Sequence, residues 1–268
     1  MTVTDDTATL LADWQRWHDA REATLREPHG WLALTALEWL DVTPRAVADL
    51  PGTWCAPGDG SVEIVASDAD GIEVGGERVD GTATVRPVDG APGVLVTVGE
   101  RVVELARRTD SYALRVRDPR ATTRTGFTGV PTFPVDPQWV VTGRFEAYPA
   151  PERITVGAVV DGLQHFPTAV GTVTIDLGGR EYRLVALAGK DGGLSLHFRD
   201  ATSGASTYGG GRILRTDDPA ADGSLVVDLN RTVNLPCAFT AYATCPLPPA
   251  ENVLDAAVEA GEKLPDPS

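Results

Sequence analysis

Short runs of alternating apolar and polar residues dominate the chain from Val62 to Leu229 and predict a fold built mainly of β-strands. Glycine and aspartate separate these runs at intervals of roughly ten residues, which is typical of antiparallel sandwiches and barrels. In residues 168–177, apolar residues alternate with threonine and aspartate, so one face of this strand is expected to be buried. The pattern indicates a mainly β protein with antiparallel barrel or sandwich architecture.

The first β region, placed at residues 30–118, holds candidate strands at Val62–Val65, Gly71–Val74, Thr82–Arg86, Val94–Val98, Arg101–Leu105 and Ala113–Arg117. The second, placed at residues 119–268, holds candidates at Trp139–Ala147, Ile154–Val160, Thr168–Leu177, Glu181–Leu187, Leu194–Phe198, Arg212–Leu214 and Leu225–Leu229. The apolar periodicity of Gly30–Leu40 is compatible with a strand and with a helix. A proline-rich connection, Pro119–Pro137, separates the two regions, and its aromatic residues favour packing over a flexible linker. We expect residues 1–268 to form a single domain.

A helix is expected at each end of the chain. Within residues 1–29, apolar residues including Trp14 and Trp17 recur at three- and four-residue steps, which predicts an amphipathic helix docked on the β-strands through its tryptophans. A short C-terminal helix is predicted to follow Pro249 and to end at Gly261.

Composition narrows the classes of function. Apolar residues make up 42% of the chain, enough for a core, and the net charge of −15 opposes binding to nucleic acid and to anionic membranes. No window reaches the roughly 18 apolar residues of a membrane span, and no secretory signal is visible in the first residues. We therefore expect a cytoplasmic protein without cofactor, and the sequence does not indicate its oligomeric state.

The densest polar cluster lies between His197 and Arg215. Leu194, Leu196 and Phe198 alternate, so Ser195, His197 and Arg199 point to the opposite face. Beyond the strand, three glycines at residues 209–211 precede Arg212. They indicate either a loop that needs positive φ angles or a run of approachable N–H groups that, with a guanidinium, holds an anion.

A second polar cluster contains Asp228, Asn230 and Asn234. These side chains either orient a ligand or form a hydrogen-bonded turn network after the last strand, and the sequence leaves both readings open. Arg115 and Arg117 share one strand face, as part of a solvated edge or as a basic lining for an acidic ligand.

Three cysteines are too few for a disulfide framework. Cys237 and Cys245 are interpreted as structural buried thiols, with a disulfide and a metal or nucleophile role as alternatives. No histidine lies near them in the sequence, so no metal site is predicted.

Several segments together resemble a bacterial family, domain of unknown function 1684. They are GWLALTALEWL, LRVRDP, FPVDPQW, TYGGGR, PCAFTAYATCPLPPAEN and the final AGEK, and they extend from about Gly30 to Lys263. The family more often has Asp-Phe-Asn-Arg-Ala-Tyr-Asn-Pro where this chain has DLNRTVNL, so the tyrosine is absent here. The resemblance implies no activity, only that these segments belong together.

Two functions remain from this reasoning. The first is binding of a small polar or anionic molecule, with ligand-binding residues gathered at the rim of the second β region: Asp200, Thr202, Tyr208, Arg212, Asp228, Asn230 and Asn234. The alternative is a hydrolase-like enzyme at the same site, with Asp200 or Asp228 as base and His197 as acid. No activated nucleophile is visible, so no catalytic residue is assigned.

Overall fold

The computed structural model describes residues 3–47 and 49–265 of the chain, which divides into two compact units. The smaller unit runs from Ala23 to Phe127. The larger unit combines the N-terminal segment up to Glu22 with the chain from Thr128 onward. The sequence pattern places the boundary between the two β regions after residue 118, earlier than Phe127, where the smaller unit ends. The assignment of the whole chain to a single domain stays a prediction.

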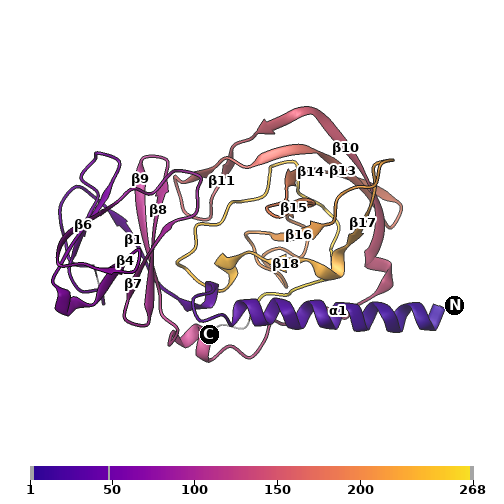
Figure 1. The fold of residues 1–268 in the computed structure, drawn as a ribbon. Helices are drawn as coiled ribbons and strands as arrows, with labels where there is room; N and C mark the ends of the chain where they lie inside the picture. The colour runs from indigo at the N-terminus through magenta and orange to yellow at the C-terminus, as the bar shows by residue number, and fades with distance from the viewer. Residues whose placement is uncertain (1–2, 48, 266–268) are drawn as a thin grey trace. The chain divides into compact units, whose positions relative to one another are not determined.

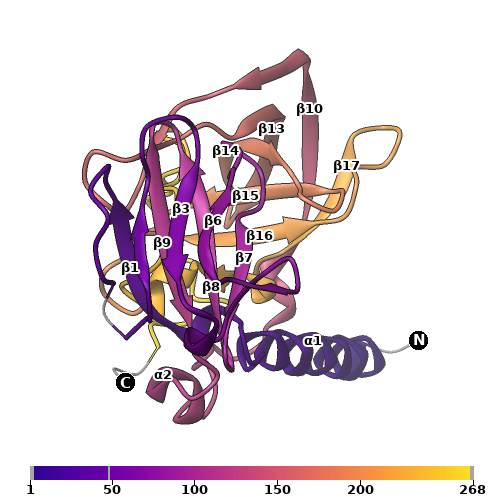
Figure 2. The same ribbon diagram turned by 60° about the vertical axis from the view of Figure 1, so that its left-hand side comes forward.

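The strands of the smaller unit are β1 (Leu34–Leu40), β2 (Thr53–Cys55), β3 (Val62–Ala66), β4 (Ile72–Val74), β5 (Glu77–Arg78), β6 (Gly81–Val85), β7 (Val94–Val98), β8 (Arg101–Arg108) and β9 (Ser111–Arg117). They form an antiparallel sheet in the order β1-β9-β8-β7-β4-β5 and a second one in the order β2-β3-β6 (Figure 2). Trp54 and Ile64 of the short sheet belong to the same apolar core as Leu105 and Leu114 of the long sheet. The smaller unit is therefore a two-sheet sandwich.

The strands of the larger unit are β10 (Val140–Arg153), β11 (Val156–Gly157), β12 (Gln164–His165), β13 (Thr168–Leu177), β14 (Arg180–Ala188), β15 (Leu194–Phe198), β16 (Arg212–Thr216), β17 (Ser224–Asp228) and β18 (Val233–Asn234). Seven of them form an antiparallel sheet in the order β17-β10-β13-β14-β15-β16-β18, and β11 pairs with β12. Strand β16 also contacts β17, although four strands lie between them in this order, so the sheet rolls into a half-barrel (Figure 1). The expected mainly antiparallel β architecture is confirmed.

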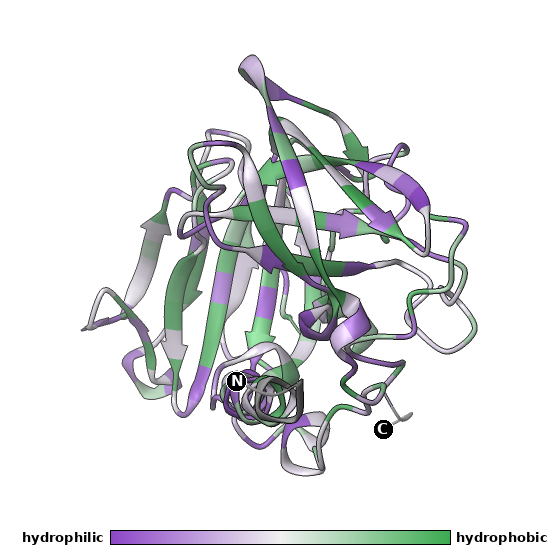
Figure 3. Ribbon diagram, turned by 90° about the vertical axis from the view of Figure 1, so that its right-hand side faces the viewer, coloured by the Kyte–Doolittle hydropathy of each residue, from purple (hydrophilic) through white to green (hydrophobic). Residues whose placement is uncertain are grey.

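The inner face of the half-barrel is apolar, and the C-terminal part of the chain covers it. Hydrophobic and hydrophilic positions alternate along strands of this unit (Figure 3). The apolar positions include Ile175 and Phe198, which belong to this core. Residues 252–264, here called the C-terminal strap, supply Leu254 and Val258 to the same core. The strap is attached through backbone hydrogen bonds, such as that from Leu254 N–H to the Arg199 carbonyl at 2.8 Å.

The N-terminal helix is present as α1 (Val3–Leu25). As expected, a tryptophan docks it: Trp14 is buried and its indole Nε1–H donates to the Asn230 carbonyl at 2.8 Å. No helix in the described part of the chain combines the length and the apolar character needed to cross a membrane. The segment Gly30–Leu40 resolves into a 3₁₀ turn, Trp31–Ala33, followed by β1.

The predicted short C-terminal helix is wrong. The described residues after Pro249 contain no helix, and the short α-helix of the chain is instead α2 (Thr122–Thr125), within the proline-rich connection. In the strap, Leu254 is buried whereas Val253 is 60% exposed. Its backbone groups bond to the segment that follows β15 rather than to each other: the N–H groups of Arg199 and Ala201 donate to the carbonyls of Asn252 and Ala256. Of the four apolar residues that suggested a helix, Leu254 and Val258 are buried, whereas Val253 and Ala257 are exposed.

Candidate functional site

The predicted ligand-binding residues are not joined in one hydrogen-bond network. They divide between two buried hydrogen-bond networks, with Tyr208 apart from both. Neither of the two pockets described below is lined by any of these seven residues.

The first network centres on an ion pair between Asp200 and Arg212, whose side chains are both 0% exposed. Arg212 Nη2 donates to Asp200 Oδ2 at 2.7 Å and to the Val258 carbonyl at 2.9 Å, and Nη1 donates to the Ala260 carbonyl at 2.5 Å. Burial lowers the pKa of Arg212, and the charge of Asp200 opposes that effect. The guanidinium fastens the C-terminal strap from inside the protein and is not presented to solvent.

Other polar residues complete this network. Thr202 donates through its amide and its hydroxyl to Asp200 Oδ1, at 2.6 and 2.5 Å. The backbone N–H of Asn234 donates to Glu262 Oε2 at 2.6 Å, and Arg21 Nε donates to Glu262 Oε1 at 3.0 Å. Helix α1, strand β18 and the strap are thus joined at one carboxylate that is 1% exposed.

The second network surrounds Asn230, which is fully buried. Its Nδ2 donates to the Asp136 carbonyl at 3.0 Å and to Asp228 Oδ1 at 2.9 Å, while its Oδ1 accepts from the Asp136 amide at 3.0 Å. Asp228 also pairs with Arg231 at 3.1 Å. Both amide donors of Asn230 are used within the protein, so the geometry favours the turn-network reading of this cluster.

The glycines before Arg212 serve close packing. A Cβ atom on Gly210 would lie 2.4 Å from the ring of Tyr208, and one on Gly211 would lie 2.7 Å from the Phe198 carbonyl. Gly211 has φ +95°, which disfavours other residues, and its N–H donates to the Tyr208 carbonyl at 3.0 Å. Their contacts favour the structural reading of this loop.

A pocket of about 220 Å³ lies at the end of β15. Its walls are Thr155, Val156, Gly157, Arg199, Leu247, Pro248, Pro249, Ala250 and Val253. Most of these residues are apolar, and Arg199 is the charged residue among them. Arg199 directly follows Phe198, the last residue of β15.

Arg199 has no partner in the described part of the protein. No hydrogen bond or ion pair joins its guanidinium to another described residue, and its Nε is buried without an acceptor. Burial raises the pKa of Tyr208 to about 12, with smaller contributions from Cys237 and Cys245. The charge of Arg199 acts in the opposite direction, so the two side chains lie near each other. Tyr208 is therefore a neutral hydroxyl beside the arginine at physiological pH.

Sequence reasoning missed Arg199 as a site residue. The available signal was its position on the polar face of a strand that ends at a loop of glycines. Arg212 begins the next strand, directly after the glycines, and the sequence does not show which of the two arginines is enclosed.

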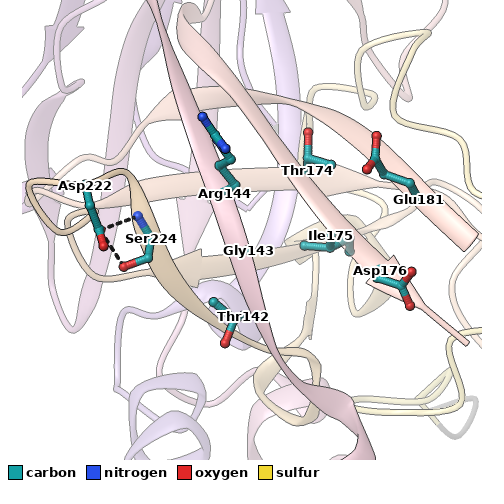
Figure 4. A pocket seen from close by; sticks show the side chains of 9 residues that line it. All are labelled: Thr142, Gly143, Arg144, Thr174, Ile175, Asp176, Glu181, Asp222 and Ser224. Carbon is teal, nitrogen blue, oxygen red and sulfur yellow. Dashed lines mark hydrogen bonds between the residues drawn. The ribbon is translucent and has the colours of Figure 1, made fainter. Parts of the chain in front are cut away.

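A larger and more open pocket, of about 410 Å³, lies on the outer face of β10, β13 and β17. Figure 4 shows its lining, in which Asp176, Glu181 and Asp222 outnumber Arg144. Asp222 already accepts from the amide and the hydroxyl of Ser224, at 2.9 and 2.6 Å. Within the described residues, no group of three or more histidine, cysteine or acidic side chains is arranged to hold a metal.

His197 is buried next to Ser195, with 3.1 Å between its Nε2 and the serine Oγ. Burial, together with the charge of Arg215, lowers its pKa to about 4. The ring is therefore neutral near pH 7 and is not poised to donate a proton there, which argues against the acid role considered for it.

The arginine pair of the smaller unit faces a carboxylate. Glu104 lies 3.1 Å from Arg115 and 2.7 Å from Arg117. Burial opposes its ionisation, but Arg117 and Arg115 hold the pKa of Glu104 below its usual value. The pair is engaged within the protein, but the expected solvated edge is wrong, because β9 lies between β1 and β8 and the Arg115 side chain is 4% exposed.

Comparison with known proteins gives a family and no activity. The model of a family described as protein of unknown function, DUF1684, matches residues 125–263. Among solved structures, the solution NMR structure of an uncharacterized protein from Haloarcula marismortui is 33% identical over 52% of this chain and 78% of that chain, with a TM-score of 0.44. No curated protein matches.

Proposed function

Because the chain belongs to DUF1684, a family of unknown function, we propose a function from its own pocket: the larger unit binds a small carboxylate or similar anion against Arg199. The observation that carries the proposal is the guanidinium of Arg199, which lines a pocket and has no acceptor among the described residues. A buried N–H group without an acceptor is unfavourable, and a ligand oxygen would satisfy it.

The pocket supports a ligand of limited size and mixed character. Its volume of about 220 Å³ is below the roughly 300–1,000 Å³ of drug-sized sites, which favours a small acid over a nucleotide. Leu247, Pro248 and Val253 offer contact to a short apolar body. The planar guanidinium offers paired donors that suit a carboxylate.

This proposal moves the charged contact from Arg212 to Arg199 and retains Tyr208 beside it. Binding by Asp200, Thr202, Arg212, Asp228, Asn230 and Asn234 stays a prediction without a pocket to support it.

A thermal-shift screen tests the proposal. Propionate, benzoate, phenylacetate and inorganic phosphate are tested against wild type, Arg199→Met and Arg144→Met. A ligand at 100 times its Kd adds about 2.7 kcal/mol to wild-type stability. We expect Arg199→Met to lose this gain and Arg144→Met, altered in the open acidic pocket, to keep it. An unchanged response in Arg199→Met, or no response of wild type to any of these anions, would refute the site.

A further inference from the structure

Cys237 and Cys245 face one another across a loop of the larger unit. The loop is held at its far end, because Val159 N–H donates to the Cys245 carbonyl at 3.0 Å and Leu247 N–H donates to the Gly157 carbonyl at 2.8 Å. At its near end, Cys237 lies in a 3₁₀ turn, Pro236–Ala238. Both cysteines are thiols in the structure.

Their mutual geometry is reciprocal. The amide N–H of Cys237 lies 3.3 Å from Cys245 Sγ, and the amide N–H of Cys245 lies 3.2 Å from Cys237 Sγ. Each side chain therefore points at the backbone of the other residue. The thiolate is the form of cysteine that reacts with disulfides.

The surroundings favour redox chemistry over metal binding. His165 reaches this loop, but its Nε2 contacts the Thr244 carbonyl at 2.5 Å. The described residues contain no metal-ligand cluster that includes the two sulfurs. A pair of cysteines already turned toward each other needs little movement to meet the distance limits of a disulfide.

We propose that Cys237 and Cys245 are a dithiol pair that closes reversibly to a disulfide when a low-molecular-weight disulfide is the oxidant. Cys237 is the more exposed of the two, so its thiolate attacks one sulfur of the oxidant, forms a mixed disulfide and releases one thiolate. The Cys245 thiolate then attacks Cys237 Sγ and releases the second thiolate. The protein loses two electrons, and the oxidant is reduced to two thiols.

The test is thiol counting in glutathione redox buffers on the folded protein. After an acid quench, the thiols are alkylated in denaturant and counted by intact mass, and the linkage is located by peptide mapping. The chain has three cysteines, and we expect all three to be alkylated in the reduced buffer and only Cys55 in the oxidised buffer. Burial and the charges of Glu63 and Asp41 raise the pKa of Cys55, so this thiol is the internal control.

Matched variants make the result specific. Cys55→Ser should still lose two thiols without gaining the mass of glutathione, whereas Cys237→Ser should form no internal disulfide. The inference is overturned if wild type keeps three thiols at every buffer ratio. It is equally overturned if the product is a stable glutathione adduct or a link between two chains.

Discussion

Arg199 and Arg212 show how much the environment of a residue decides its role. Both lie at strand ends in the same polar stretch of sequence. Arg212 is enclosed because the carbonyls of Val258 and Ala260 reach it from a distant part of the chain. Arg199 meets no such acceptor among the residues that the structure describes. Because those carbonyls belong to a strap that was read as a helix, the sequence did not reveal which arginine is available to a ligand.

Removing the enclosed arginine should be costly. Breaking a buried ion pair leaves a charge without compensation, so Arg212→Met is expected to lower the free energy of unfolding by about 3–5 kcal/mol. The control is Arg86→Met. Arg86 is 62% exposed and pairs with Asp59, so removing this surface ion pair should lower the free energy of unfolding by less than about 1 kcal/mol. Urea denaturation measures both, and equal losses would show that Arg212 is not a structural clamp.

His197 should make stability depend on pH. Its pKa is about 4 in the folded protein and about 6.5 in an unfolded chain. Between these values only the unfolded state binds the proton, so the free energy of unfolding falls as the pH decreases from 6.5 to 4 and is unaffected by this group above 6.5. The full effect is about 3 kcal/mol. His197→Asn should flatten this part of a urea-denaturation pH series, and an identical slope in the variant would contradict the assignment.

At the scale of elements, the C-terminal strap is attached to the half-barrel through Asn252. This fully buried side chain accepts from Val185 N–H at 2.7 Å and donates to the carbonyls of Val185 and His197 at 2.9 and 2.8 Å. It bonds the strap to two strands, β14 and β15. The apolar spacing in this segment is compatible with a helix, and the sequence alone gives no sign that one asparagine bonds two strands.

Asn252→Leu should therefore loosen the strap. Leaving three backbone groups unsatisfied is expected to cost about 3 kcal/mol or more, measured by urea denaturation. The neighbouring Val253→Ala, at a position 60% exposed, should change stability by about 0.5 kcal/mol or less. A small effect of Asn252→Leu would mean that the strap is held by its apolar contacts alone.

The strands themselves were largely predictable. Candidates such as Val94–Val98, Thr168–Leu177 and Leu194–Phe198 coincide with β7, β13 and β15 because each alternates in hydrophobicity and ends at turn residues. Short strands without alternation were missed, such as β2 and β18. Strand β18 consists of Val233 and Asn234, and its pairing with Arg212 and Ile213 depends on tertiary structure.

At the scale of the whole molecule, the family match and the two proposals fall in the same part of the chain. The match covers residues 125–263, which includes the Arg199 pocket and the cysteine pair but none of the strands of the smaller unit. The resemblance drawn from the sequence begins earlier, at Gly30.

Contacts of α1 explain why the N-terminal segment belongs with the larger unit. Arg21 pairs with Glu262, and the sequence alone does not show where that carboxylate lies.

The most direct test of the central claim is an NMR titration of the isotope-labelled protein with the carboxylate that gives the largest thermal shift. We predict that the backbone amides with the largest chemical-shift changes are those of Gly157, Arg199 and Val253, which surround the pocket, and that these changes disappear in Arg199→Met. Changes centred instead on Asn230 and Asn234, or on Thr142 and Thr174 of the open pocket, would contradict the assignment of the site to Arg199.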